Sequence, residues 1–471
     1  MAITTTILHG HTLDESIRQT TGPTGKPTGN LVGGRTPGHM LDQDRGRARI
    51  PSAPRGVKVV LPGLLGKNRQ NIDINEDILS KHILLLGGTG SGKTNLLYYF
   101  IKQLKNSMTA NDVMIIFDTK GDFFDKFYKP GDTVLANSKQ YKSVMQLWNI
   151  YKEIVADGWE DADILANTHE IIGSLFRDAS EKSSQPFFPN AARDLLASLI
   201  VAHIRVGRDD LSIKRRFFNN EALKQYLDML TPDKIRALLG CFPDLRSVLT
   251  YIGDGSSDQA LGVMAELQSV VRRVLMGSFS GDGRFSVRNF VRSKAAKTLF
   301  IEYDLAIGET LTPIYRLLFD LALKEAMGRQ KTEGNVYLIC DEFKLLPHLH
   351  HIEDGVNFGR SLGVKVIAGI QSIEQLYQIY GERKGKNIAA GFSSVFAFKA
   401  GDPGTRDYVS RLYGKNIVLE QYKTAANTLV EKRREGNTVE DWNLTNLSIG
   451  EAIVGLPFQQ PFRFKFDIYR G

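Results

Sequence analysis

The chain has 471 residues, of which 42% are hydrophobic and 24% charged, and its formal net charge is +8. This composition is ordinary for a globular protein and excludes a disordered or collagen-like chain. Two cysteines are too few for a disulfide scaffold and fit no metal-ligand spacing. No apolar stretch reaches the ~20 residues of a membrane-spanning helix, and no signal-peptide pattern opens the sequence. We therefore expect a soluble, cytoplasmic protein without a transmembrane segment, whose basic excess permits nucleic acid as a partner without requiring it.

The first 55 residues are rich in Gly, Thr, Pro and Arg and show no sustained periodicity. Such a composition is typical of a flexible basic arm. Two interpretations stay open for residues 1–55: a solvated tail, or an arm that contacts nucleic acid or a neighbouring subunit.

A glycine-rich loop follows the apolar run Ile83–Leu86 and has the spacing G-x-x-x-x-G-K-T. Strand, loop and helix in this order are typical of a phosphate-binding loop, because the glycines let backbone N–H groups turn toward phosphate oxygens. The lysine reaches the outer phosphates and the threonine hydroxyl binds Mg²⁺. The pattern predicts a site for ATP and Mg²⁺. Its residues are Gly87, Gly88, Thr89, Gly90, Ser91, Gly92, Lys93 and Thr94.

A second apolar run, Val113–Phe117, is followed by polar residues that begin with Asp118 and Lys120. In a parallel α/β sheet the residues just past the strand ends line the ligand crevice, so Asp118 is a candidate cofactor-binding residue. The alternative is a polar turn in which Gly121 takes a left-handed conformation.

Residues 141–290 have a different character, because apolar residues recur there at helical spacing between proline and glycine clusters. We interpret this segment as an all-α inserted domain. It contains a basic patch for which both a solvated face and contact with a substrate are open. The patch consists of Arg205, Arg208, Lys214, Arg215 and Arg216.

Strand character returns at Thr298–Tyr303, and a helix is predicted from Pro313 to Met327. The next apolar run ends in Asp341 and Glu342. An acidic pair at a strand end is the expected complement of a phosphate loop: Asp341 would hold Mg²⁺ and Glu342 would orient or activate the attacking water.

Two further candidates flank the next strand, Val364–Ile370. Gln371 at its end is either a residue that senses the γ-phosphate or aligns water, or an amide that caps a turn. Arg360 before it is either an arginine donated across a subunit interface or an ordinary surface arginine. We expect an α/β fold with a mostly parallel central sheet, formed by residues 56–140 and 291–471.

The order of these motifs resembles the type IV coupling proteins, conjugative DNA-transfer ATPases of the FtsK and HerA P-loop translocase superfamily. The resemblance runs from about Val60 to Tyr469. It is carried by the loop at 87–94, the segments 117–122, 340–343, 359–363 and 369–372, and the stretch after Phe398. Typical members also carry N-terminal transmembrane helices, which are not found here, and Thr119 replaces the usual proline.

The resemblance implies a RecA-like nucleotide-binding domain in which Lys93, Thr94, Asp341, Glu342 and Gln371 serve catalysis and metal binding. It implies Arg360 as the arginine acting in trans, and Asp118 and Lys120 as crevice residues. It also implies a homo-hexamer that binds DNA by its backbone, with a relaxase or secretion-channel component as further partner and peripheral recruitment to the inner membrane.

Three functions remain open at this stage. The first is an ATP-hydrolysing DNA translocase that acts as a coupling protein in conjugative transfer and type IV secretion. The second is a nucleotide-gated adaptor that recruits a DNA–protein substrate. The third is a soluble HerA- or FtsK-like translocase in DNA repair or phage defence.

Overall fold

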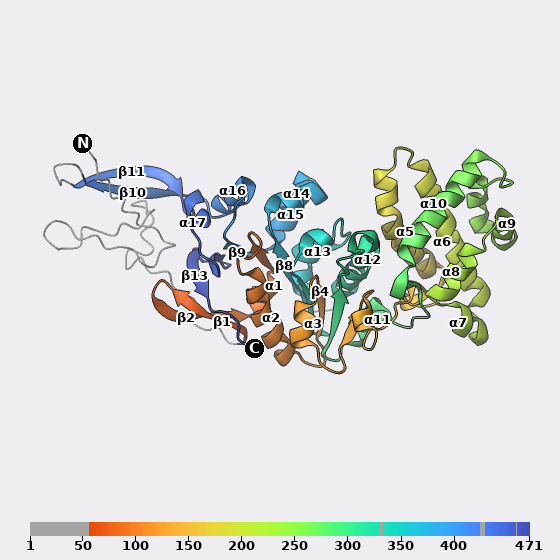
Figure 1. The fold of residues 1–471 in the computed structure, drawn as a ribbon, viewed down its shortest axis with the longest axis horizontal. Coiled ribbons are helices and arrows are strands. Elements are labelled where there is room, and N and C mark those ends of the chain that lie inside the picture. The colour runs from red at the N-terminus through yellow and green to blue at the C-terminus, as the bar shows by residue number, and fades with distance from the viewer. Residues whose placement is uncertain (1–55, 329–332, 424–428, 458) are drawn as a thin grey trace. The chain divides into compact units, whose positions relative to one another are not determined.

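The computed structural model describes residues 56–328, 333–423, 429–457 and 459–471 (Figure 1). The chain forms two compact units. The described part of the first unit comprises residues 56–109, 333–344, 353–423, 429–457 and 459–471, and that of the second comprises residues 110–328 and 345–352. The predicted arm, residues 1–55, lies outside the described residues.

The strand β3 (Ile83–Leu86) lies inside the sheet of the first unit. It pairs in parallel with β8 (Val364–Ile370) on one side and with β9 (Ser394–Phe398) on the other, and β8 pairs in parallel with β7 (Val336–Cys340). Every residue of these four strands is buried. Short, nearly continuous apolar runs are typical of strands covered on both faces, which is why the sequence predicts β3, β7 and β8.

The same sheet continues on the far side of β9 as an antiparallel extension. Its strands, in spatial order, are β12 (Glu451–Gly455), β13 (Phe462–Phe466), β1 (Val57–Leu65) and β2 (Asn68–Asn75). The sequence did not predict β2, because its first four residues are exposed and polar and only Ile72 and Ile74 face the core.

The helix α2 (Lys93–Ser107) follows the glycine loop and lies beside β1 (Figure 1). Its apolar side, including Leu97 and Phe100, is buried against the sheet. On the same helix the Gln103 side chain accepts from the Val60 N–H and donates to the Val60 carbonyl, at 2.9 Å each. These two hydrogen bonds to the extended backbone of β1 fix the position of α2 along that strand.

The first turn of α2 is also fixed to the last residues of the chain. The Asn95 side-chain amide donates to the Asp467 carbonyl at 2.9 Å and its oxygen accepts from the Tyr469 N–H at 2.7 Å. The Tyr469 ring packs edge-on against Tyr99, one helical turn further on. The start of the helix is therefore held from outside the loop that precedes it.

Further helices and a hairpin complete the first unit. They are α1 (Glu76–Ser80), α13 (Ile352–Asn357), α14 (Ile373–Tyr380), α15 (Glu382–Gly391), α16 (Pro403–Leu412), α17 (Asp441–Thr445) and the antiparallel pair β10 (Lys415–Lys423) and β11 (Leu429–Asn437).

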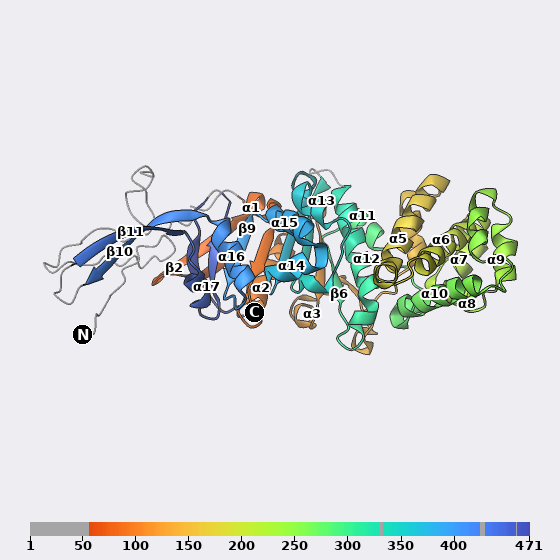
Figure 2. The ribbon, with the colours of Figure 1, turned by 90° about the horizontal axis from the view of Figure 1, so that it is seen from above.

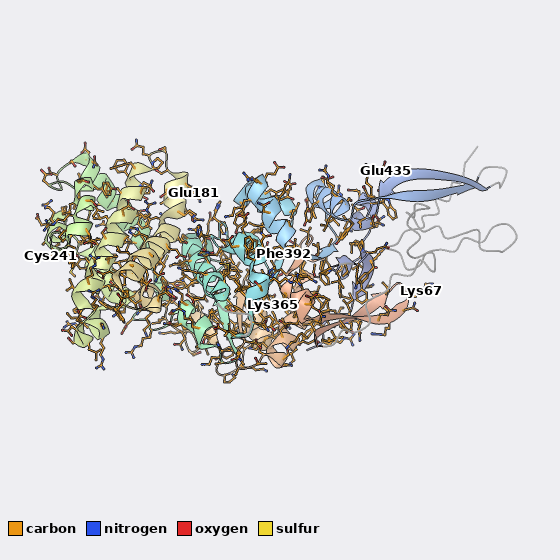
Figure 3. The ribbon with its side chains drawn as sticks, turned by 180° about the vertical axis from the view of Figure 1, so that it is seen from behind. Lys67, Glu181, Cys241, Lys365, Phe392 and Glu435 are labelled. Carbon is orange, nitrogen blue, oxygen red and sulfur yellow. The ribbon has the colours of Figure 1, made fainter. Side chains whose placement is uncertain are left out.

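Buried polar groups lie at the end of β3 that is opposite the glycine loop. Lys365 on β8, labelled in Figure 3, donates to the Ser80 hydroxyl at 2.7 Å. His82 accepts from the Val366 N–H through Nδ1 and meets the Phe392 ring edge-on. Burial lowers the pKa of His82 to about 3, so the ring stays neutral and can accept this hydrogen bond at pH 7.

The second unit contains three parallel strands. The strand β6 (Lys297–Glu302) pairs with β4 (Val113–Asp118) on one side and with β5 (Thr133–Leu135) on the other. The helices connected to these strands are α3 (Asp122–Phe127), α11 (Val287–Ser293) and α12 (Gly308–Met327). The three-residue β5 is too short to produce a periodic signal, and the sequence did not predict it.

All regular elements between residues 139 and 293 are helical, as the periodicity predicts. The α-helices before α11 are α4 (Ile150–Ile154), α5 (Asp161–Lys182), α6 (Phe187–Gly207), α7 (Leu211–Phe217), α8 (Asn220–Asp228), α9 (Pro232–Leu239) and α10 (Asp258–Val274). Among them α5, α6 and α10 lie side by side (Figures 1 and 2). The predicted domain boundaries, residues 141 and 290, stay a prediction. The compact second unit is a larger division of the chain, and its bounds lie at other residues.

One predicted helix start is wrong. The helix α12 begins at Gly308, five residues before the predicted Pro313, which therefore lies inside the helix. The preceding turn is stabilised by Thr312, whose hydroxyl donates to the Gly308 carbonyl at 3.1 Å. None of the helices in the described part of the chain combines the length and apolarity needed to cross a membrane.

Candidate active site

The glycine loop joins β3 to α2 and is anchored by backbone bonds on both sides. The Gly87 N–H donates to the Ile370 carbonyl at 3.1 Å and the Gly88 N–H donates to the Lys399 carbonyl at 3.0 Å. Gly87 has a φ of +151°, and a Cβ atom there would lie 2.7 Å from the Cβ of Phe398. The first glycine of the motif is thus required by backbone conformation and by the close approach of β9.

Lys93 is the first residue of α2, and its side chain is buried within the loop. Its ammonium donates to the carbonyls of Gly87 and Gly88, at 2.5 and 3.1 Å. The positive end of the α2 dipole lies at the same place, after Gly92 with its φ of +118°. A buried ammonium group beside a helix N-terminus forms an electropositive cradle that suits phosphate groups.

Thr94 and Asp341 lie in contact although they are 247 positions apart in the sequence. The Thr94 hydroxyl donates to Asp341 Oδ2 at 2.8 Å. Asp341 directly follows β7, whose parallel neighbour β8 pairs in turn with β3, so both residues come from carboxyl ends of the same sheet. Hydroxyl and carboxylate oxygens are the ligands that Mg²⁺ prefers. The residues present therefore fit a magnesium ion, as the spacing predicts.

The next two candidates also form a pair. Gln371 Nε2 donates to Glu342 Oε2 at 2.7 Å. The other oxygen, Glu342 Oε1, is buried and makes no hydrogen bond among the described residues, and the nearest ammonium, that of Lys344, lies 3.9 Å away. A buried carboxylate oxygen with free acceptor capacity is costly unless a further donor reaches it, and a water molecule poised for reaction would be such a donor.

Gly369, in the interior of β8, sets the position of Asp341, and the sequence analysis missed it. A Cβ atom at Gly369 would lie 2.3 Å from the Asp341 carbonyl oxygen and 3.2 Å from its Cα. A glycine inside a strand often marks such a close backbone approach, which was the available signal. The Lys399 carbonyl and Gly450, whose N–H donates to the Ser91 carbonyl, carried no sequence signal.

We expect Gly369→Ala to reduce the ATP hydrolysis predicted for this site by about 100-fold, because the new methyl group must displace Asp341 by about an ångström. Phosphate release in the presence of Mg²⁺ measures the effect. The matched control is Gly401→Ala, since a Cβ there meets nothing within 4 Å. Equal activity of the two variants would contradict the packing role of Gly369.

The two remaining candidates, Arg360 and Asp118, bind other groups than the candidates described above. The Arg360 guanidinium is exposed and binds the carboxylate of Asp77, in the first turn of α1, at 2.9 Å. Asp118 is buried at the end of β4, and its two oxygens accept four backbone N–H groups at 2.8–3.1 Å. The four donors are the N–H groups of Lys120, Gly121, Phe123 and Phe124. These bonds favour the turn interpretation for Asp118, with Gly121 at a φ of +77°.

A second buried carboxyl group lies beside this turn. Glu302, opposite Asp118 in the register of β6 and β4, accepts from the Tyr141 hydroxyl at 2.7 Å through Oε2. Its Oε1 has no partner among the described residues. Burial, together with the nearby charge of Asp118, raises the pKa of Glu302 to about 9. Glu302 is therefore neutral at pH 7 in the folded protein.

This raised pKa makes stability depend on pH. The folded state binds a proton on Glu302 that the unfolded state releases above its ordinary pKa, 4.5. The stabilisation is thus fully present below pH 4.5 and is lost as the pH rises toward 9. Glutamine is neutral at every pH. We therefore expect the melting temperature of the Glu302→Gln variant to exceed that of the parent by at least about 2–4 °C at pH 8 and to lie close to it at pH 5. Glu309→Gln, at an exposed position, is the control. If the melting temperatures of the parent and E302Q depended on pH in the same way, the claim that Glu302 is protonated in the folded state would be refuted.

The parallel strands, the glycine loop and the acidic strand end together define a P-loop protein with a RecA-like arrangement. Residues 69–460 match the family model described as the type IV secretion-system coupling protein DNA-binding domain. Because the match covers most of the chain, the protein belongs to this family.

Two curated relatives fit this assignment. The chain is 25% identical over 403 residues to the coupling protein TraD of Escherichia coli (strain K12), covering 80% of this chain and 50% of TraD. It is 28% identical over 281 residues to the conjugal transfer protein TraG of Rhizobium radiobacter, covering 55% of this chain and 41% of TraG. The chain thus spans about half the length, or less, of the curated relatives it matches.

Solved structures show the same fold. The unbound conjugative coupling protein TrwBdeltaN70 superposes with a TM-score of 0.69 at 21% identity, covering 89% of this chain and 90% of that one. TrwB in complex with ADP and Mg²⁺ gives a TM-score of 0.68 at 21% identity, with the same coverage. VirB4 of Thermoanaerobacter pseudethanolicus gives 0.54 at 13% identity, covering 89% and 99%.

Proposed function

We propose that this chain is the ATP-hydrolysing motor of a coupling protein that moves DNA in conjugative transfer. The observation that carries the proposal is the contact between Thr94 and Asp341 beside the pair of Glu342 and Gln371. It brings the phosphate loop and the acidic strand end, which are far apart in the sequence, into one site. The family description and the names of TraD, TraG and TrwB supply the conjugative setting.

Each residue of the site has a chemical task in this proposal. The loop N–H groups and the Lys93 ammonium bind the β- and γ-phosphates of ATP and stabilise the charge that grows in the transition state. Thr94 and Asp341 hold Mg²⁺, which neutralises the phosphate oxygens when bound. Lys93 exchanges its bonds to the loop carbonyls for bonds to phosphate as the nucleotide enters.

Glu342 acts as the general base of the hydrolysis. Its free Oε1 accepts a proton from water as the water oxygen bonds to the γ-phosphorus. The bond from the γ-phosphorus to the bridging oxygen breaks, and ADP and inorganic phosphate leave. Gln371 orients Glu342 through its amide and senses whether the γ-phosphate is present.

The proposal includes a homo-hexameric ring with DNA in a central channel, bound through its phosphates without sequence preference. Arg360 is proposed to leave Asp77 and reach the γ-phosphate bound by a neighbouring subunit. Arg360 is exposed and its ion pair lies at the surface, so breaking that pair costs little free energy in water. A relaxase or a secretion-channel component is the proposed protein partner.

Two measurements test this function. The first is Mg²⁺-dependent ATP hydrolysis with and without DNA, together with the particle mass with an ATP analogue and DNA. The second is displacement of a triplex-forming strand from duplex DNA. A motor hydrolyses ATP faster with DNA and clears the strand; hydrolysis without displacement would instead indicate the nucleotide-gated adaptor.

A further inference from the structure

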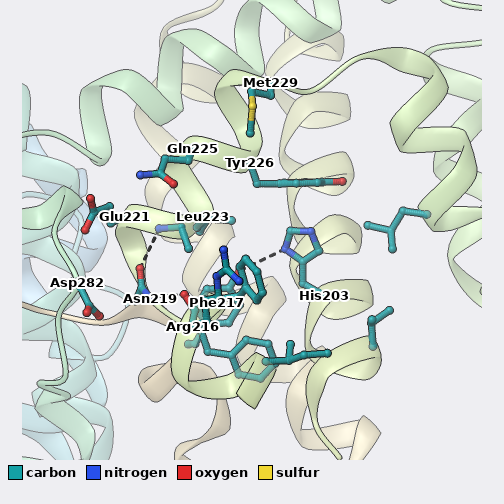
Figure 4. A pocket seen from close by; sticks show the side chains of 16 residues that line it. His203, Arg216, Phe217, Asn219, Glu221, Leu223, Gln225, Tyr226, Met229 and Asp282 are labelled. Carbon is teal, nitrogen blue, oxygen red and sulfur yellow. Dashed lines mark hydrogen bonds between the residues drawn. The ribbon is translucent and has the colours of Figure 1, made fainter. Parts of the chain in front are cut away.

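The cavity between α6, α7 and α8 has a volume of about 570 Å³ and lies in the second unit (Figure 4). Aromatic rings form much of its wall. Tyr151 and Phe218 stack at 5.0 Å between centroids, and the rings of His203 and Tyr226 meet edge-on at 4.1 Å. Cavities of this size that combine aromatic walls with polar groups are typical of ligand sites.

Three apolar side chains at the mouth of the cavity are exposed to water. Val206 is 57% exposed, Phe217 47% and Met229 61%, and all three line the cavity. Clustered exposed apolar groups of this kind mark a surface that a partner covers.

Polar groups of the wall have unused bonding capacity. Burial lowers the pKa of His203 to about 4, so the ring is neutral at pH 7. Its Nδ1 lies 3.3 Å from the Tyr151 hydroxyl, and its Nε2 has no hydrogen-bond partner among the described residues. The hydroxyl of Tyr226 and the carboxylate of Glu221 likewise have none there, and both residues line the cavity. A ligand with hydrogen-bond donors and acceptors on a flat ring would use these groups.

Beside the mouth lies the exposed C-terminal turn of α7 with three consecutive basic residues, Lys214, Arg215 and Arg216. In the described part of the chain none of the three forms an ion pair. Lys214 Nζ lies 4.1 Å from the centre of the Trp159 ring, and the Arg216 guanidinium lies 5.1 Å from that of Phe217. By contrast, the basic residues on α6 and directly after it, Arg205 and Arg208, are bound to Asp161.

We propose that this cavity binds one unstacked base of single-stranded DNA while the basic turn of α7 binds the adjoining phosphates. Aromatic walls beside cations that lack ion pairs are the combination that single-stranded nucleic acid requires, since bases stack on rings and phosphates bind Lys and Arg. A paired base inside a duplex cannot enter such a cavity. Glu221 and Asp282 on the wall suit the N–H donors of the bases, including the ring N3–H of thymine, which donate hydrogen bonds to carboxylates. The inference rests on DNA being the substrate of the proposed motor.

The test measures binding of a fluorescent 20-nucleotide oligodeoxythymidine, and of a matched duplex, to the full chain by anisotropy at several salt concentrations. Phe217→Ala should weaken single-strand binding about tenfold with an unchanged salt slope, because it removes stacking. The double variant Arg215→Ala/Arg216→Ala should weaken it and reduce the slope of log affinity against log salt by about 1.4, the value for two phosphates of a single strand. Duplex binding should stay within about twofold in both.

Matched controls exist in the same unit. Phe187, 45% exposed on α6, does not line the cavity, and Arg272 and Arg273 are adjacent exposed arginines on α10. Phe187→Ala and the double variant Arg272→Ala/Arg273→Ala should leave single-strand affinity within about twofold. ATP hydrolysis without DNA should be unchanged in all four variants, because none of these residues belongs to the nucleotide site.

A photocrosslink gives an independent readout. An oligonucleotide with 5-iododeoxyuridine should attach to the peptide that carries Phe217 or Tyr226, as identified by mass spectrometry. Unchanged single-strand affinity of F217A, or attachment only elsewhere, would overturn the inference; the cavity would then be a site for a partner polypeptide. If the parent hydrolyses ATP faster with DNA in that case, the proposed motor stands and only the base site fails.

Discussion

Lys93→Ala is expected to abolish ATP hydrolysis and to weaken MgATP binding by at least about 100-fold. The ammonium is the buried positive charge inside the loop, and it is held by the carbonyls of Gly87 and Gly88. Its loss removes a charge-assisted contact to the outer phosphates in both the ground state and the transition state. Phosphate release measures turnover, and calorimetry with a non-hydrolysable ATP analogue measures affinity.

Lys102→Ala is the matched control, because Lys102 is an exposed lysine on the same helix. It should retain parental turnover and affinity. Melting temperatures of both variants separate loss of binding from loss of fold. Parental hydrolysis by K93A would refute the assignment of the glycine loop as the ATP site.

Glu342→Gln is expected to have an equally large effect on turnover with little effect on binding. The amide has the shape of the carboxylate and can still accept from Gln371 Nε2, so the geometry of the pair is kept. It cannot take a proton from water, which should reduce hydrolysis by about 10²–10⁴-fold. ATP affinity should stay within about threefold, because the proposed role of Glu342 is to act on the attacking water and not on the phosphates.

Glu374→Gln, at an exposed carboxylate three positions after Gln371, is the control and should hydrolyse ATP normally. E342Q should also accumulate in the ATP-bound form, so its particle mass with MgATP reports the assembled state. Turnover of E342Q near the parental rate would exclude Glu342 as the base and leave the neighbouring Asp341 as the candidate.

The phosphate loop and the acidic strand end could be located from the sequence because each is a local pattern at the end of a continuous apolar run. Parallel strands buried on both faces leave no polar alternation, so Ile83–Leu86 and Val336–Cys340 were easy to recognise. Their contact across 247 positions followed from a rule of α/β sheets, that carboxyl ends of strands share an edge.

Contacts made by the backbone could not be predicted in this way. The Lys399 carbonyl and the Gly450 N–H anchor the loop through backbone groups, which all residue types except proline possess in full, so no side chain marks them. The role of Asp118 was ambiguous for a related reason: an aspartate after a strand serves a ligand or its own backbone equally well. Only the four N–H groups around it favour the second interpretation.

The bonds of Asn95 to Asp467 and Tyr469 have a practical consequence for handling this protein. Asn95 directly follows Thr94, so residues 467–469 hold the helical turn that presents the proposed magnesium ligand. Cleavage of the backbone before Asp467 would leave the strands of the sheet in place and yet release the first turn of that helix. Protein cleaved there should therefore lose nucleotide affinity before it loses secondary structure.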